Sequence, residues 1–167
     1  MFYTEILESF YKNKIRYLLV GGLALNLHGV PRTTFDMDII IPSDKINFGK
    51  LINAIKELNY VPRLPVDPLK MADPEVLKDW IENKNMKAFS FYHKIDNARV
   101  IDIVLVHPLG FDEAEARKKV FTFRGIEIPV LSIDDLIEMK KFSGRPKDLS
   151  DAEMLREAKS ISGDGNE

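Results

Sequence analysis

Residues 20–42 read VGGLALNLHGVPRTTFDMDIIIP, and this stretch decides how the chain folds. It is apolar almost throughout, yet Asp36 and Asp38 stand two residues apart directly before three isoleucines. Alternate residues of a strand project from the same face, so both carboxylates point to one side. Each negative charge makes ionisation of the other more costly unless a cation lies between them. The stretch therefore predicts a β-strand whose polar positions hold a cation.

The composition limits the kind of protein that this chain forms. A chain of 167 residues with 45% hydrophobic and 30% charged residues fits one compact domain, which we assign to residues 1–161, with a flexible polar tail at 162–167. A formal net charge of -2 indicates no general attraction to nucleic acid or to an anionic membrane. The absence of cysteine excludes disulfides and thiolate metal sites, and a reducing cytoplasm is the simplest location. No apolar run approaches the roughly 20 residues that span a bilayer, so we expect a soluble, cytoplasmic protein without a membrane partner.

Strand and helix patterns alternate along the chain. This order predicts an α+β (α/β two-layer) fold in which helices pack on a mixed β-sheet. Besides the strand of Asp36 and Asp38, we expect strands at residues 17–20, 88–92, 99–106, 120–123 and 126–130. We expect helices at residues 1–14, 23–28, 43–58, from 74 past 80, from 132 and at 147–161, and a loop at 61–73. Ser43 is the expected N-cap of the third helix, and Ile46 begins its core face.

A third carboxylate lies in equally apolar surroundings. Asp102 interrupts the run VIDIVLV at residues 100–106. An unpaired buried carboxylate is costly, so three acids on two core strands are expected to converge at one edge of the sheet. Oxygen ligands on rigid strands suit Mg²⁺ or Mn²⁺ better than zinc, because a hard cation prefers carboxylate and water. Asp36, Asp38 and Asp102 are therefore the candidate metal ligands.

Two glycines supply the complementary feature. Gly21 and Gly22 directly follow one predicted strand and open a short helix. Glycine allows the backbone to approach a ligand closely, and free amide groups in such a turn can bind phosphate. A triphosphate on this turn would bring its own Mg²⁺ to the acids. Many Gly-Gly turns serve chain geometry only, so the inference depends on the spacing to the Asp-x-Asp strand.

The spacing of these residues resembles that of a known superfamily. Gly21-Gly22, thirteen intervening residues, Asp36-Met37-Asp38 and a later strand with Asp102 resemble the nucleotidyltransferase superfamily of the polymerase-beta type. The segments GGLALNLHGVPRTTFDMD and DLIEMKKFSGRPKDLSDAEML are similar to small nucleotidyltransferase-like proteins that include abortive-infection toxins of type IV toxin-antitoxin systems. The resemblance covers residues 17–41, the Asp102 strand and residues 134–155. Residues 62–87 have no counterpart in it.

The resemblance implies an enzyme with NTP as substrate and Mg²⁺ or Mn²⁺ as cofactor. It implies that Asp36 and Asp38 hold two Mg²⁺ ions. It also implies that Asp102 is the third ligand and the catalytic base. Gly21 and Gly22 would seat the triphosphate.

The late motif places a lysine on the inward face of its helix. Ile133, Leu136 and Ile137 mark that face, and Lys140 follows at the same spacing, whereas Lys141 points away from it. A lysine at such a position can extend past the core to solvent, or it can reach a phosphate on the Gly-Gly turn. We predict that Lys140 is the cation that binds the triphosphate.

Three further basic residues are candidate nucleotide-binding residues, namely Arg32, Arg145 and Lys147. Arg32 is equally well explained as a salt-bridge partner of the acids. In the same way, Asp148 can cap the helix that begins there, and Asp151 can pair with Lys147 four residues earlier.

Two classes of function remain open. The first is an enzyme that moves a nucleoside monophosphate from an NTP to a hydroxyl of tRNA, of a protein or of a small molecule, by in-line attack between two metals. Such an enzyme can be a toxin-antitoxin component, with an antitoxin or a second copy of the chain as partner. The second is a nucleotide-binding or partner-binding module that keeps the fold without turnover. The presence of all three acids favours the enzyme, and the fold alone does not choose the acceptor.

Overall fold

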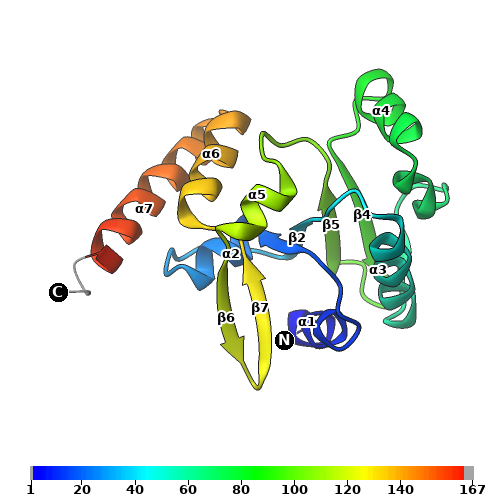
Figure 1. Ribbon diagram of the computed structural model, residues 1–167, viewed down its shortest axis with the longest axis horizontal. Helices are drawn as coiled ribbons and strands as arrows, with labels where there is room; N and C mark the ends of the chain where they lie inside the picture. The colour runs from blue at the N-terminus through cyan, green and yellow to red at the C-terminus, as the bar shows by residue number, and fades with distance from the viewer. Residues whose placement is uncertain (1, 164–167) are drawn as a thin grey trace.

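The computed structural model describes residues 2–163 and contains a mixed seven-stranded sheet. Its strands are β1 (Leu18–Val20), β2 (Asp36–Ile40), β3 (Tyr60–Pro62), β4 (Ala88–His93), β5 (Val100–Val104), β6 (Lys119–Phe123) and β7 (Ile126–Val130). They lie in the order β3-β4-β5-β2-β1-β7-β6 (Figure 1). β2 pairs in parallel with β5 and antiparallel with β1, and β1 pairs in parallel with β7. The predicted α+β fold with a mixed sheet is confirmed.

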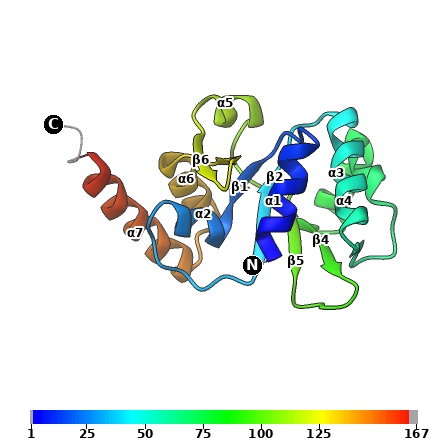
Figure 2. The ribbon, with the colours of Figure 1, turned by 90° about the horizontal axis from the view of Figure 1, so that it is seen from below.

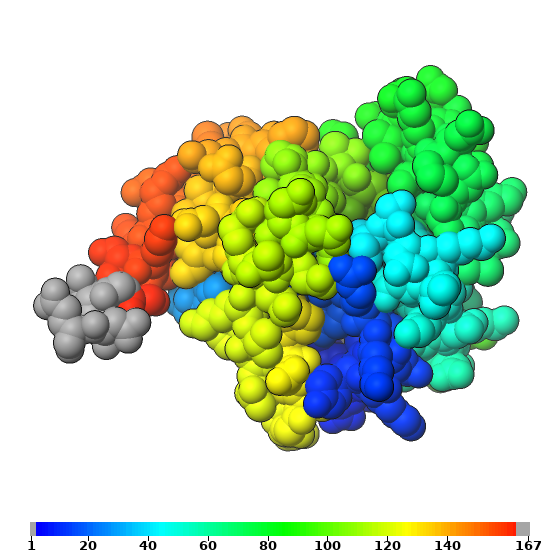
Figure 3. Space-filling view, viewed as in Figure 1, coloured from blue at the N-terminus to red at the C-terminus, as the bar shows by residue number. Residues whose placement is uncertain are grey.

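Helices pack around this sheet. They are α1 (Phe2–Lys12), α2 (Gly21–Leu27), α3 (Lys45–Glu57), α4 (Pro74–Asn83), α5 (Phe111–Ala116), α6 (Ile133–Ser143) and α7 (Pro146–Gly163), with a 3-10 helix η1 at Pro68–Ala72. α6 and α7 lie at one end of the molecule and α3 and α4 at the other, in both Figure 1 and Figure 2. The space-filling view shows α5 between these two groups on one face (Figure 3).

The core fixes the position of the central strands. β1 is buried along its whole length, and Met37, Ile39 and Ile40 of β2 have no exposed surface. Trp80 of α4 is also buried and stacks on Phe89 with ring centroids 5.8 Å apart, so it belongs to the core as its apolar surroundings indicate. Because buried apolar residues pack tightly around β2 and β5, the polar residues on these strands are held at fixed positions.

Sequence analysis missed one strand, β3, and two short helices, η1 and α5. β3 and η1 overlap residues 61–73, which the prolines indicate to be a loop, and no element was expected at the position of α5. β3 has only three residues and ends in Pro62, so it shows no alternation, and it forms because it pairs antiparallel with β4 at the edge of the sheet. Tertiary pairing therefore outweighs the local signal here.

The start of α3 also differs from the expectation. Asp44, not Ser43, is the N-cap, because its Oδ1 accepts hydrogen bonds from the backbone N–H groups of Ile46 and Asn47. Ile46 is 75% exposed and does not begin the core face, which starts with the buried Asn47 and Phe48. Asn47 can be buried without leaving its amide unpaired, because its side chain hydrogen-bonds to both the backbone N–H and the backbone C=O of Arg16.

The last helix is longer than its sequence pattern indicates. α7 ends at Gly163, so residues 162 and 163, assigned above to the tail, are helical. The rest of that tail, residues 164–167, lies outside the described residues. Within residues 2–163 no helix combines the length and the apolar character that a membrane crossing requires.

The cap of α3 yields a stability prediction. Asp44→Ala removes the acceptor of two N–H groups and should lower the free energy of unfolding by about 1 kcal/mol. Ser43→Ala is the matched control and should change it by less than ~0.5 kcal/mol. Urea denaturation followed by circular dichroism measures both. A larger loss for Ser43→Ala would show that the cap is assigned to the wrong residue.

Candidate active site

The register of the sheet brings the three acids together. Asp38 on β2 lies directly beside Asp102 on β5 in a parallel pair, and Asp36 precedes Asp38 by two residues on the same strand. Side chains at paired positions of neighbouring strands project from the same face, as do those two residues apart. On the other side of β2, Asp38 pairs with Val20, the last residue before Gly21. The acids and the glycine turn are therefore neighbours.

Gly21 is required for two reasons. Its φ of +70° lies in the left-handed region, where other L-residues are strained. In addition, a Cβ at this position would lie 2.1 Å from Oδ2 of Asp38, which is far inside contact distance. The backbone of Gly21 thus packs directly against the carboxylate of Asp38, and the predicted juxtaposition of turn and acids is present in the structure.

Gly22 has a different surrounding from the one expected. A Cβ there would lie 2.8 Å from Cβ of Thr34 and 3.4 Å from Cγ of Arg32. A larger residue would therefore first collide with the loop that leads into β2. The structure gives a packing reason for this glycine, and its role in seating a triphosphate stays a prediction.

Burial and neighbouring negative charge raise the pKa of two of the acids, Asp36 and Asp38. Burial, together with the charges of Asp102 and Asp36, raises the pKa of Asp38 to about 7, although the charge of Lys140 works in the opposite direction. Burial and the charge of Asp102 also raise the pKa of Asp36, against the charge of Arg63. The acids therefore lack enough positive charge from the protein alone.

Two residues near the acids were missed by sequence reasoning. Ser90 of β4 pairs with Asp102 across the strands, and its hydroxyl donates a hydrogen bond to Oδ1 of Asp102. The signal in the sequence was a polar residue inside the apolar run AFSFY at 88–92. Arg63 follows β3, in the segment without a counterpart, and its charge lowers the pKa of Asp36. No local pattern indicates that it faces the acids.

The donor set suits a hard divalent cation. Asp36, Asp38 and Asp102 would hold Mg²⁺ or Mn²⁺ through carboxylate oxygens, and their mutual repulsion favours a cation among them. Across the described residues, 2–163, no group of three or more histidine, aspartate or glutamate side chains is arranged so that it could hold a metal ion. Asp38 and Asp102 are the close pair, whereas the third acid influences them through its charge. The metal ligands therefore remain predictions.

Lys140 connects the acids to a second acidic cluster. Its Nζ lies 3.1 Å from Oδ2 of Asp151 and 3.3 Å from Oδ1 of Asp148. Its charge partly offsets the rise in the pKa of Asp38. Only 15% of the Lys140 side chain is exposed, compared with 50% for Lys141, which pairs with Glu138. The helix phase read from the sequence is therefore right. The two acidic partners of Lys140 were not foreseen.

Asp148 and Asp151 are 2% and 1% exposed, which is unusual for carboxylates. Burial opposes ionisation of Asp148, but hydrogen bonds from Arg145 and Ser143 and the charge of Lys140 outweigh it and lower the pKa of Asp148 to about 2. Asp148 is thus bound on several sides as well as lying in the first turn of α7.

The partners of Asp151 correct two sequence interpretations. Asp151 binds Arg32 at 2.9 Å and Lys140, instead of Lys147. Arg32 is a salt-bridge partner of an acid, as one alternative held, but that acid is Asp151 and not Asp36 or Asp38. The pair joins residues 119 positions apart in the sequence, so no local spacing could reveal it.

The remaining basic candidates lie further out. Arg145 is mostly exposed and pairs with Asp148 at 2.7 Å, so it belongs to the second cluster. Lys147 is exposed in the first turn of α7, and the structure does not bring it to the three acids. His28 is held by the carbonyl of Leu131 at 2.8 Å, which fits a structural role.

Comparison with solved structures supports the fold. The lincosamide antibiotic adenylyltransferase LnuA in its lincomycin-bound form has a TM-score of 0.57 and 17% identity, over 93% of this chain and 93% of that one. ANT(2")-Ia in complex with adenylyl-2"-tobramycin has a TM-score of 0.56 and 14% identity, over 92% and 85% of the two chains. A solution structure of the same antibiotic-resistance factor has a TM-score of 0.57 and 14% identity, over 98% and 83%.

No protein-family model matches the sequence, and no curated protein matches it.

Removing a charge from the acid cluster should stabilise the metal-free protein. At pH 8 with EDTA, Asp38→Asn relieves burial of a charge and repulsion by Asp102, so its melting temperature should exceed that of the parent by several degrees. Glu57→Gln, at an exposed position, is the control and should change little. Differential scanning calorimetry measures the shift. A lower melting temperature for Asp38→Asn would contradict the electrostatic account.

Asp148 yields a prediction in acid. Its pKa is lowered in the fold from 3.8 to about 2. Its contribution to the free energy of unfolding is therefore present above pH 3.8 and is lost as the pH falls toward 2. The loss corresponds to about 2 kcal/mol. Asp148→Asn should remove this part of the pH dependence, whereas Asp134→Asn, an exposed partner of Lys159, should retain it. Urea titrations between pH 5 and 2 test this, and parallel curves for Asp148→Asn and the parent would disprove it.

At such low identities the likeness establishes the fold and no more, and the resemblance read from the sequence is confirmed to that extent: this chain has the fold of the nucleotidyltransferases.

Proposed function

We propose that the protein is a Mg²⁺-dependent nucleotidyltransferase that moves a nucleoside monophosphate from an NTP to a hydroxyl group of a small molecule. The observation that carries this proposal is the in-register pair of Asp38 and Asp102, with Asp36 beside it and the backbone of Gly21 against it. Acids on two parallel strands next to a glycine turn can hold the metal and the phosphates in one place.

The chemistry is a single displacement at the α-phosphorus. The acceptor oxygen forms a bond to that phosphorus, the bond to the β-phosphate oxygen breaks, and pyrophosphate leaves with the electron pair. Asp102 would take the proton of the hydroxyl, and Ser90 would orient Asp102 through its hydrogen bond. Mg²⁺, when bound by the acids, would neutralise phosphate charge and lower the pKa of the hydroxyl.

Lys140 is proposed as the cation for the triphosphate. Asp148 and Asp151 hold its Nζ close to Asp38, so its position is fixed before a nucleotide arrives. Asp151 also binds Arg32, which places a second cation beside the same acid. The buried acids thus act as positioning residues, and Arg145 stabilises Asp148 from the outer side.

A small-molecule acceptor is preferred because of the structural neighbours. One of them is an adenylyltransferase bound to lincomycin, and another is in complex with adenylyl-2"-tobramycin. In both, the fold extends over more than four fifths of the matched chain, so the likeness does not rest on an isolated motif. tRNA or protein as acceptor, an antitoxin or homodimer partner, and a toxin-antitoxin role remain predictions of the sequence.

A transfer assay tests the proposed function. Purified protein is incubated with each α-labelled NTP, Mg²⁺ and one of three acceptor pools: hydroxylated antibiotics including lincomycin and tobramycin, total tRNA, or lysate proteins. We expect label in the first pool. Asp102→Asn should lower turnover by at least about 100-fold and leave NTP affinity nearly unchanged, because its proposed role is proton transfer. Label in tRNA or protein instead would support nucleotidyl transfer but contradict the small-molecule acceptor.

A matched pair of lysines tests the nucleotide contact. Lys140→Gln should weaken NTP binding in isothermal titration calorimetry, whereas Lys141→Gln, exposed one residue later, should not. Circular dichroism controls for folding, since Asp148 and Asp151 lose a partner in the first variant. A parent protein that binds NTP and Mg²⁺ but labels none of the three pools would favour the binding module.

A further inference from the structure

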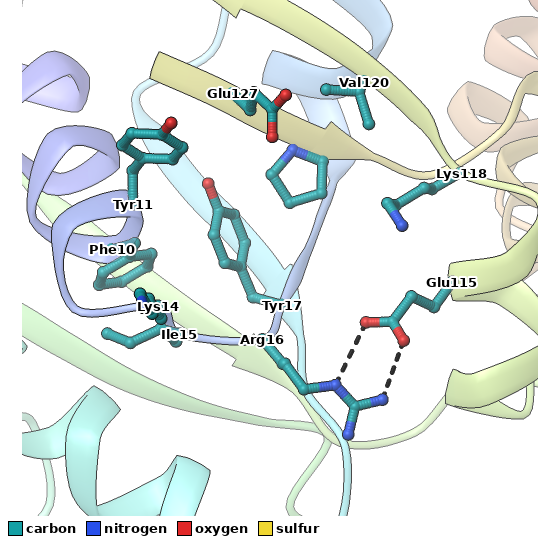
Figure 4. A pocket seen from close by; sticks show the side chains of 11 residues that line it. Phe10, Tyr11, Lys14, Ile15, Arg16, Tyr17, Glu115, Lys118, Val120 and Glu127 are labelled. Carbon is teal, nitrogen blue, oxygen red and sulfur yellow. Dashed lines mark hydrogen bonds and ion pairs between the residues drawn. The ribbon is translucent and has the colours of Figure 1, made fainter.

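A separate pocket lies between α1, the loop before β1, α5 and the β6–β7 hairpin (Figure 4). Its volume is about 260 Å³, slightly below the usual range for ligand sites, which indicates a small ligand. None of the three acids, the glycine turn or Lys140 lines it. It is therefore distinct from the candidate active site.

The base of this pocket contains a hydroxyl without a partner. Tyr17 is 3% exposed, and its oxygen makes no hydrogen bond within the part of the chain that the structure describes. Burial raises the pKa of Tyr17, so the group remains an O–H donor. A buried donor without an acceptor is costly, and such groups normally have one. The hydroxyl therefore calls for an acceptor that the described side chains do not supply.

The surroundings of this hydroxyl show what could reach it. In Figure 4 it points toward the space between Tyr11 and Glu127. Solvent does not reach the oxygen in this conformation, but Tyr11 is 46% exposed. A ligand therefore reaches Tyr17 only after a side chain of the lining moves, and Tyr11 belongs to that lining and, like other exposed side chains, changes rotamer within nanoseconds. Glu127 also lines the pocket, and its carboxylate can accept a hydrogen bond from a ligand, although it makes none with Tyr17.

The walls and charges define the ligand further. Phe10 packs edge-to-face on Tyr17 with centroids 5.1 Å apart, so an aromatic wall flanks the hydroxyl. Lys14 and Lys118 line the pocket as exposed cations, whereas Arg16 is neutralised by Glu115 at 2.9 Å. Together with Glu127, the lining carries one net positive charge.

We propose that this pocket binds an anionic heteroaromatic compound whose ring edge presents a hydrogen-bond acceptor next to a donor. The acceptor would take the Tyr17 O–H, the donor would bond to Glu127, and the anionic group would face Lys118. The ring would lie against Tyr11, which is the exposed aromatic side chain of the lining. The site is separate from nucleotidyl transfer and does not depend on it.

Three probes separate these contributions. Pterin-6-carboxylate has both the ring edge with an acceptor next to a donor and the anionic carboxylate. Pterin has the ring edge alone, and naphthalene-2-carboxylate has the carboxylate alone. In protein-observed NMR titrations we expect saturable binding of the first, and weaker binding of the other two. Mg²⁺ with ATP should not displace it. The absence of saturable binding, or displacement by Mg²⁺ and ATP, would overturn the proposal.

Variants test the residues. Tyr17→Phe keeps the ring and removes the donor, so it should weaken the binding of pterin-6-carboxylate about fivefold or more. It should also raise the melting temperature of the free protein, because the unpaired hydroxyl is gone. Lys118→Gln should weaken the carboxylate probes only. Lys12→Gln on α1 lies outside the pocket lining and is the control. Equal affinity of Tyr17→Phe and the parent would overturn the proposal.

Discussion

The structure depends on placing two carboxylates side by side on neighbouring strands. Asp38 lies beside the like charge of Asp102, and burial makes the charge of Asp38 more costly still. Folding brings them together because the residues between and around them are apolar, with Ile39, Ile101 and Ile103 fully buried. A shift of the register by one residue would turn the acids into the core and the isoleucines outward. The core therefore fixes the register, and the register creates the site.

A second cluster ties the C-terminal helices to this sheet. The buried acids Asp148 and Asp151 come from α7, yet they bind Lys140 of α6 and Arg32 of the loop before β2. Removing one member would leave a buried charge without a partner, which is more costly than losing an exposed pair. α6 and α7 are thus held relative to Asp38 by charge as well as by apolar packing. This explains how a lysine near the end of the chain can be fixed beside acids from its first quarter.

The sequence predicted features that local spacing encodes. Apolar runs interrupted by acids predicted the strands of Asp36, Asp38 and Asp102, and helical phase separated Lys140 from Lys141. It could not predict pairs formed across the fold. The salt bridge of Arg32 to Asp151 and the hydrogen bond of Ser90 to Asp102 depend on which elements become neighbours. β3 was missed for the same reason, since its pairing with β4 defines it, and the cap of α3 was displaced by one residue.

The charges of the two clusters explain why a divalent cation suits this site. Five carboxylates are gathered there, against four cations: Asp36, Asp38, Asp102, Asp148 and Asp151 against Arg32, Arg63, Lys140 and Arg145. The cations are unevenly shared, because most of them form ion pairs with the buried acids of α7. The three acids on the strands receive only part of the charge of Lys140 and Arg63. The three acids therefore lack positive charge close to their own oxygens. A small, strongly charged ion among these oxygens supplies it better than another side chain could.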